Sequence, residues 1–109
     1  MGLITASIRM NELRQSKLDL EYKIQLITQA RMNLAQSTSD LTQVGADYDS
    51  NSPIAKTLAQ RQAKLKILEQ KLEQQMMDYQ QQLKMIEAEQ DSAKEMFNNN
   101  VKTAFQYEL

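Results

Sequence analysis

Cysteine and histidine are both absent from this chain of 109 residues. Without cysteine there is no disulfide framework and no thiolate zinc site, and without histidine the commonest catalytic base and imidazole metal ligand are missing. Carboxylates remain, but Glu87, Glu89 and Asp91 fall on an exposed helical pattern that offers no pocket. We therefore expect no catalytic residue, no metal and no cofactor, and a protein that is not an enzyme.

Long apolar runs and an excess of charge of one sign are also missing. No stretch approaches the ~20 apolar residues that span a bilayer, and Met1–Met10 lacks the pattern of a cleaved signal peptide. The 13 basic residues nearly balance the 14 acidic ones, which argues against a nucleic-acid surface. We expect a soluble chain with no membrane span and no nucleic-acid partner, either cytoplasmic or exported without a cleaved signal.

The chain does contain an apolar repeat at spacings of three and four, which breaks once between Gly45 and Pro53. Before the break the repeat comprises Leu3, Ala6, Met10, Leu13, Lys17, Leu20, Ile24, Ile27, Arg31, Leu34, Thr38 and Leu41. After it the repeat comprises Ile54, Leu58, Arg61, Leu65, Leu68, Leu72, Met76, Tyr79, Leu83, Ile86, Gln90, Ala93 and Phe97. This spacing predicts an all-α fold: two long antiparallel helices that form a coiled-coil hairpin. A lone hairpin buries one line of contact, so we expect oligomerisation to complete the fold.

The expected single domain, residues 1–109, divides into a helix over about 3–44, a turn at 45–52 and a helix over about 53–107. Gly45 is the expected stop signal, since glycine tolerates a left-handed backbone. Ser52 is the expected cap of the second helix, and Pro53 suits the first helical position. The weak point is Asn98–Asn100, where the helix either continues or folds back on the hairpin. The spacing of four between Leu68, Leu72 and Met76 predicts a local unwinding of the supercoil.

Two charged residues, Lys17 and Arg31, occupy positions in the apolar repeat. With the turn centred near Asp49, residue i of the first helix lies opposite about residue 98 minus i. This arithmetic places Arg31 near Glu69 and Lys17 near Asp78. The four residues are therefore candidates for register-setting pairs; the alternative is a loose edge at which both cations are solvated.

Two further apolar groups have no place in the hairpin contact and are the candidate assembly interface. The first is a second apolar line on the first helix, beside the contact line, which comprises Ile4, Ile8, Leu18, Tyr22, Leu26 and Ala30. The second is the amphipathic C-terminal end, which comprises Phe97, Val101, Ala104, Phe105, Tyr107 and Leu109. The pairing arithmetic leaves about residues 96–109 without an opposite helix. The alternatives are scattered surface hydrophobes and a C-terminus that caps its own hairpin.

The Asp-Ser-Asn-Ser-Pro turn at Asp49–Pro53, the two amphipathic helices, the uncleaved polar N-terminus and the amphipathic end from Phe97 to Leu109 resemble a known architecture. It is that of the helical hairpin subunits of type III secretion needles and the coiled-coil terminal regions of flagellins. The resemblance implies that subunits polymerise helically around a channel after export, with the terminal helix as the assembly element. It also implies a secretion apparatus as a partner.

We therefore expect a non-enzymatic structural subunit that assembles with copies of itself, with an exported bacterial filament or surface assembly as the specific candidate. The alternative is a soluble coiled-coil adaptor or chaperone-like hairpin that binds the helix of a partner protein in its groove.

Overall fold

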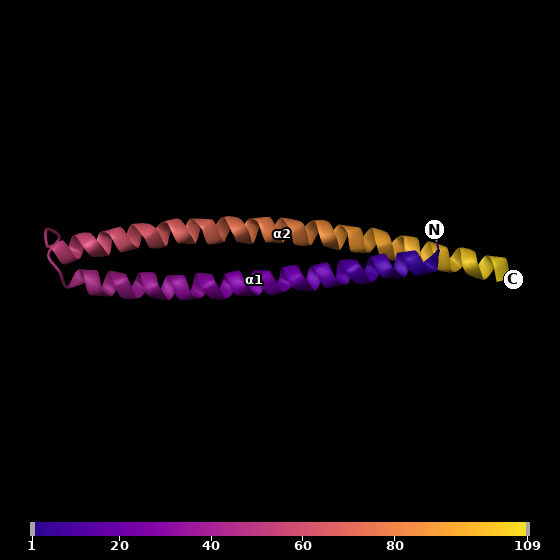
Figure 1. Ribbon diagram of the computed structural model, residues 1–109, viewed down its shortest axis with the longest axis horizontal. Coiled ribbons are helices and arrows are strands. Elements are labelled where there is room, and N and C mark those ends of the chain that lie inside the picture. Colours follow the sequence, from indigo (N-terminus) through magenta and orange to yellow (C-terminus); the bar gives the residue numbers. More distant parts are fainter. Residues whose placement is uncertain (1, 109) are drawn as a thin grey trace. The chain divides into compact units, whose positions relative to one another are not determined.

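The computed structural model describes residues 2–108, which form two α-helices joined by a short turn (Figure 1). The helix α1 spans Leu3–Ala46, and α2 spans Pro53–Glu108. No strand occurs within the described residues. The expected all-α hairpin is confirmed. The helix α2 runs without interruption through Asn98–Asn100, so the fold-back of the C-terminus is wrong: the neighbouring residues favour the helix enough to carry three asparagines.

The start of α2 is set by the local interactions that the sequence indicates. The Ser52 hydroxyl accepts a hydrogen bond of 3.1 Å from the amide of Ala55, and it donates one of 2.8 Å to the carbonyl of Asp49. The first bond satisfies one of the free amides at the helix N-terminus, which is the function of an N-cap. Pro53 follows at the first helical position, where its missing N–H costs no hydrogen bond.

Gly45 does not end α1, contrary to expectation. The helix continues through Ala46, and Gly45 has no positive φ. A Cβ at this position would lie 3.7 Å from Cδ1 of Leu58, an ordinary van der Waals distance, so Gly45 lies beside α2 but the space there does not require glycine. The predicted pairing places residue 45 opposite residue 53, whereas Gly45 lies beside Leu58. Near the turn the helices therefore pair in a different register from the one expected.

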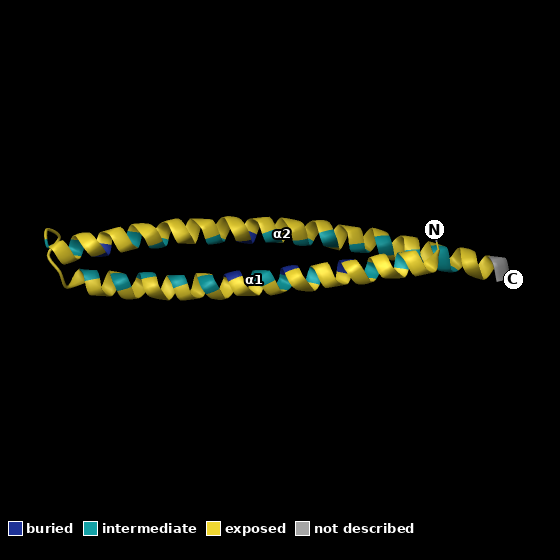
Figure 2. Cartoon of the chain, in the orientation of Figure 1, coloured by how far each residue is buried: buried dark blue, intermediate teal, exposed yellow. Residues whose placement is uncertain are grey.

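The described chain forms two compact units, which share both helices. Unit 1 comprises Met1–Lys23 and Tyr79–Leu109, and unit 2 comprises Ile24–Asp78. In each unit a segment of α1 packs against a segment of α2, and the residues at their contact are the least exposed (Figure 2). The buried hydrophobic residues are Leu13 and Leu20 in unit 1 and Ile27, Leu58 and Met76 in unit 2.

The contact between the helices departs from the predicted repeat in unit 2. Ala55 and Gln62 are half-buried, whereas the predicted neighbours Ile54, Arg61 and Leu68 are exposed. The face of α2 that α1 covers near the turn is therefore shifted by one position at these sites, while Leu58 and Leu65 keep their predicted places. The exposure of Leu68, at 48%, lies where the four-residue spacing predicts a disturbance of regular coiled-coil packing.

Candidate association surface

The second apolar line of α1 lies in solvent. In unit 1 the side chains of Ile4, Ile8, Leu18 and Tyr22 are 78%, 56%, 59% and 59% exposed. At 100° per residue, their mean direction from the helix axis is roughly 150° from that of the residues packed on α2. The line therefore faces away from α2. The sequence pattern places it beside the contact between the helices, and that placement is wrong. Two members of this line lie in unit 2: Leu26 is 52% exposed, whereas Ala30 is half-buried.

A groove next to this line brings together residues of both helices in unit 1. It has a volume of about 500 Å³ and is lined by Ile8, Met10, Asn11 and Phe97 together with Ser7 and Arg14. Phe97 is half-buried here. The expectation that Phe97 projects beyond the hairpin is therefore wrong, because the observed register keeps this part of α2 alongside α1.

The segment of α2 that leaves α1 begins later than expected. Asn100 still lines a groove with Thr5 and Ala6, and Val101 is half-buried. The residues 102–106 are all exposed, and the last turns of α2 extend past the N-terminus of α1 (Figure 1). Of the candidate interface residues here, Ala104 and Phe105 project, with Phe105 63% exposed. Leu109 and the side chain of Tyr107 lie outside the described residues.

Charged contacts connect the two helices of unit 1. Arg9 Nη2 lies 2.7 Å from Glu89 Oε2, and the Lys23 ammonium lies 5.7 Å from the ring centroid of Tyr79, a cation–π distance. Lys17 Nζ lies 4.0 Å from both Glu21 and Glu87. Lys17 thus meets carboxylates as predicted for a register residue, but the assignment of Asp78 as its partner is wrong. In unit 1 the partner of Lys17 on α2 is Glu87.

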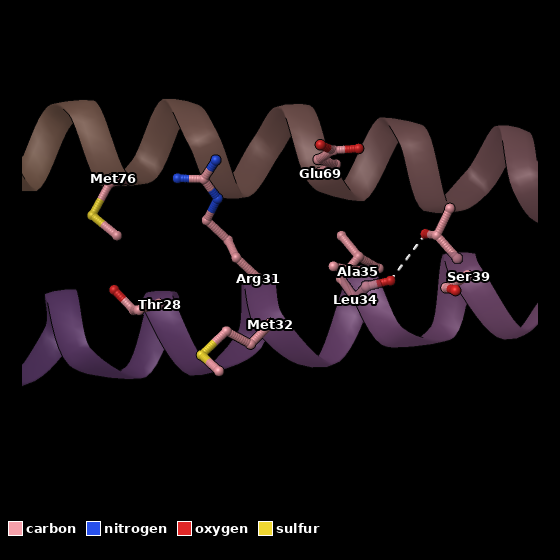
Figure 3. Close-up of a pocket in the computed structure, with 9 residues that line it drawn as sticks. Thr28, Arg31, Met32, Leu34, Ala35, Ser39, Glu69 and Met76 are labelled. Carbon is pink, nitrogen blue, oxygen red and sulfur yellow. Dashed lines mark hydrogen bonds between the residues drawn. The ribbon is translucent and has the colours of Figure 1, made fainter.

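The other expected pair, Arg31 and Glu69, lies in unit 2. Both residues line a groove of about 600 Å³, whose other lining residues include Met32, Ala35 and Met76. Arg31 extends from α1 across this groove toward α2, while Glu69 lies farther along α2 (Figure 3). The two are neighbours, as predicted, but they do not form an ion pair within 4.0 Å in the described structure. Arg31 is exposed, which fits the alternative of a solvated edge.

The sequence pattern did not predict this groove of unit 2. Leu34 and Met76 of its apolar lining belong to the predicted contact line, but Met32 and Ala35 lie outside it. The four-residue spacing from Leu68 to Met76 is the one sequence signal at this place, and it indicates loosened packing rather than a groove.

The described residues contain no group of three or more acidic side chains placed to hold a metal ion. Within the same residues neither helix has a stretch that combines the length and the apolarity needed to cross a bilayer. No family model matches the chain, and no curated protein or solved structure is similar to it. The resemblance to needle and flagellin subunits therefore stays a prediction.

Proposed function

We propose that this protein is a non-enzymatic structural subunit that associates with copies of itself through the outer face of α1 in unit 1. The observation that carries the proposal is the exposure of Ile4, Ile8, Leu18 and Tyr22, each more than half accessible. Burying one Ile, Leu or comparable apolar side chain contributes ~1.5–3 kcal/mol. The contact between α1 and α2 of one chain provides little of this stabilisation, since only five hydrophobic side chains are buried among the described residues.

The projecting end of α2 supports the same proposal. Phe105 is 63% exposed, and an aromatic residue near a helix end gains stability only when another surface covers it. A second copy can supply that surface. In this proposal the outer face of α1 joins subunits, and the segment 102–108 extends the assembly into a filament or surface structure, as the resemblance to needle and flagellin subunits implies.

Sedimentation of the purified chain over a wide concentration range tests the proposal. We expect a mass above that of the monomer and a Tm that rises with concentration, because association stabilises the folded state by mass action. The double variant Leu18→Ser/Tyr22→Ser should shift the population toward monomer. Met85→Ser is the matched control: Met85 is 65% exposed in unit 1 but lies on α2, and its replacement should leave the mass unchanged.

A monomeric mass at all concentrations with a constant Tm would overturn self-association. Negative-stain microscopy of the same samples distinguishes filaments from discrete oligomers. The variant Phe105→Ser tests the projecting end of α2 separately from the exposed apolar line of α1. We expect Phe105→Ser to shorten or abolish filaments while smaller oligomers persist through α1.

The groove of unit 2 supports the adaptor function as a second candidate. It holds about 600 Å³ between Met32, Ala35 and Met76, and methionine-lined grooves can accept an apolar face of a foreign helix. If the chain is monomeric, an amphipathic helical peptide that protects the amides of residues 28–39 from hydrogen exchange would favour this candidate.

A further inference from the structure

The exposed apolar line of unit 1 is part of a complete heptad line. Asn11 and Gln15 fill the gap between Ile8 and Leu18, so that positions 4, 8, 11, 15, 18 and 22 follow each other at spacings of four, three, four, three and four. Asn11 and Gln15 are exposed, like the four apolar residues. An alternation of three and four is the pattern of a coiled-coil contact. All six side chains of this line are exposed, and Ile8 and Asn11 also line the groove that includes Phe97 of α2.

We propose that this heptad line pairs with the same line of a second copy, in parallel and in register. The inference rests on the self-association proposed above and adds the partner surface and its orientation. In this arrangement every residue of the line meets its own copy: Ile4 lies opposite Ile4 of the partner subunit, and Tyr22 lies opposite the partner's Tyr22.

Charge complementarity decides between the two orientations. In a parallel coiled coil, the residue before an a position faces the partner residue five places later. With Ile8, Gln15 and Tyr22 at a positions, Arg14 therefore faces the partner's Asp19, and the symmetry makes this pair twice. Both side chains are exposed and oriented by neighbours on α1: Arg14 Nη2 bonds to Asn11 Oδ1 at 3.2 Å, and Asp19 Oδ2 lies 3.1 Å from Lys23 Nζ.

The antiparallel alternative matches the apolar residues about as well but places like charges together. A two-fold axis at position 13 sets Ile4 opposite Tyr22 of the partner subunit. It then brings Arg14 toward Arg14 of the partner subunit and Glu12 toward the partner's Glu12. Like charges across a coiled coil are unfavourable, and flanking charges of this kind set helix orientation.

The two amides at the centre of the line fit the parallel register. Asn11 lies opposite the partner's Asn11, and Gln15 opposite the partner's Gln15. Each side-chain amide carries both a donor and an acceptor, so identical amides can bond to each other across the contact. A polar layer within an apolar line fixes the register of a coiled coil, because slipping it would place an amide against a hydrophobic side chain.

The absence of cysteine allows a direct test by disulfide cross-linking. Ile4→Cys and Tyr22→Cys are made as separate variants and oxidised alone and as a mixture. A disulfide needs Cα atoms within about 7 Å, which the parallel register provides for each variant with itself. In the antiparallel arrangement the two copies of position 4 are roughly 27 Å apart along the axis. Ser16→Cys, exposed on the same helix outside the line, is the control.

We expect Ile4→Cys and Tyr22→Cys each to form covalent dimers alone, and Ser16→Cys to form none. Cross-linking only in the mixture of the first two would overturn the parallel orientation while leaving self-association intact. Equal cross-linking of Ser16→Cys would overturn the assignment of the line. A wild-type chain that stays monomeric in sedimentation would remove the proposed function and this inference together.

Charge variants give a second measurement that leaves the apolar line untouched. We expect Arg14→Asp and Asp19→Arg each to raise the dissociation constant about tenfold, since each change turns two attractive pairs into repulsive ones. The double swap should restore the dissociation constant to within about threefold of wild type. Arg14→Ala distinguishes the two orientations by the direction in which the dissociation constant changes. It should weaken a parallel dimer but tighten an antiparallel one, so tighter association would overturn the proposal.

Discussion

Units 1 and 2 are built from the same two helices, yet different interactions hold them. In unit 1 both buried residues, Leu13 at 3% and Leu20 at 5% exposure, are well covered, and charged contacts such as Arg9–Glu89 join the helices. In unit 2 the described residues form no ion pair, and the one side-chain hydrogen bond between the helices, from Gln62 to Thr42, is 3.4 Å long. Unit 2 also holds the larger groove.

This difference shows that the interactions between the two helices of a coiled-coil hairpin can change along the sequence. In unit 1 charged contacts join the two helices, and the second apolar line of α1 stays exposed. Unit 2 has fewer specific contacts, and no residue of its α1 segment after Ile27 is buried. We expect local opening to be easier in unit 2 than in unit 1, because exposed backbone hydrogen bonds and sparse burial lower the free energy of opening.

The largest expected effect compares one substitution in the two units. Leu13→Ala in unit 1 should lower the free energy of unfolding by ~3 kcal/mol, because it leaves a cavity beneath a side chain that is almost fully covered. Leu34→Ala in unit 2 should cost only ~1 kcal/mol, since Leu34 is half-buried and lines the groove. Urea denaturation followed by circular dichroism at one low protein concentration measures both.

Equal losses for Leu13→Ala and Leu34→Ala would contradict the comparison, because they would mean that the two units are equally well packed. Leu18→Ala is the control for helix propensity: it is the same change on α1 at an exposed position. Its effect on the monomer should stay within about 0.5 kcal/mol.

The second prediction weakens unit 2 at its turn. Ser52→Ala removes the N-cap of α2, whose hydroxyl bonds to the amide of Ala55, and should cost ~1 kcal/mol. Hydrogen exchange should show the loss of protection in the first turns of α2, while the amides of residues 8–20 keep theirs. Ser52→Asp, which retains a capping oxygen, should restore most of the protection. Loss of protection throughout unit 1 would instead mean that the two units open together.

The third prediction strengthens the same end of unit 2. Gly45→Ala should stabilise α1 by ~0.5–1 kcal/mol, because alanine favours the helix more than glycine does. The added Cβ would meet Leu58 Cδ1 at 3.7 Å, an ordinary van der Waals distance. A higher Tm with slower exchange near residues 42–46 is the expected outcome. A lower Tm would show that the close approach of Leu58 requires glycine.

These positions also show which parts of the structure are readable from sequence. The start of α2 was predicted because Ser52 and Pro53 act within one turn of helix. The prediction that α1 stops at Gly45 is wrong, since the helix continues through Ala46 and Gly45 lies beside Leu58 of the other helix. In unit 1 the Arg9–Glu89 pair fits the predicted pairing arithmetic, whereas Lys17 meets Glu87 rather than Asp78 and Phe97 lies against α1. These partners depend on packing between the helices, which the apolar repeat alone does not specify. Helical periodicity predicts a second apolar line from Ile4 to Tyr22, but it places that line beside the hairpin contact, whereas the exposed side chains face away from α2.

The smallest expected effect concerns the charged contacts themselves. Glu89→Gln removes the carboxylate that lies 2.7 Å from Arg9. Both side chains are about half exposed, at 50% and 55%, so solvent screens the pair and its loss should cost only ~0.5 kcal/mol. The cost should shrink further in high salt. The control is Glu73→Gln in unit 2, because Glu73 is exposed and has no ion pair in the described structure. This variant should show neither the loss of stability nor the salt dependence. Denaturation of both variants at low and high ionic strength measures this difference. A similar salt response in the two variants would mean that the ion pairs of unit 1 do not distinguish it from unit 2, and that packing around Leu13 and Leu20 alone carries the comparison.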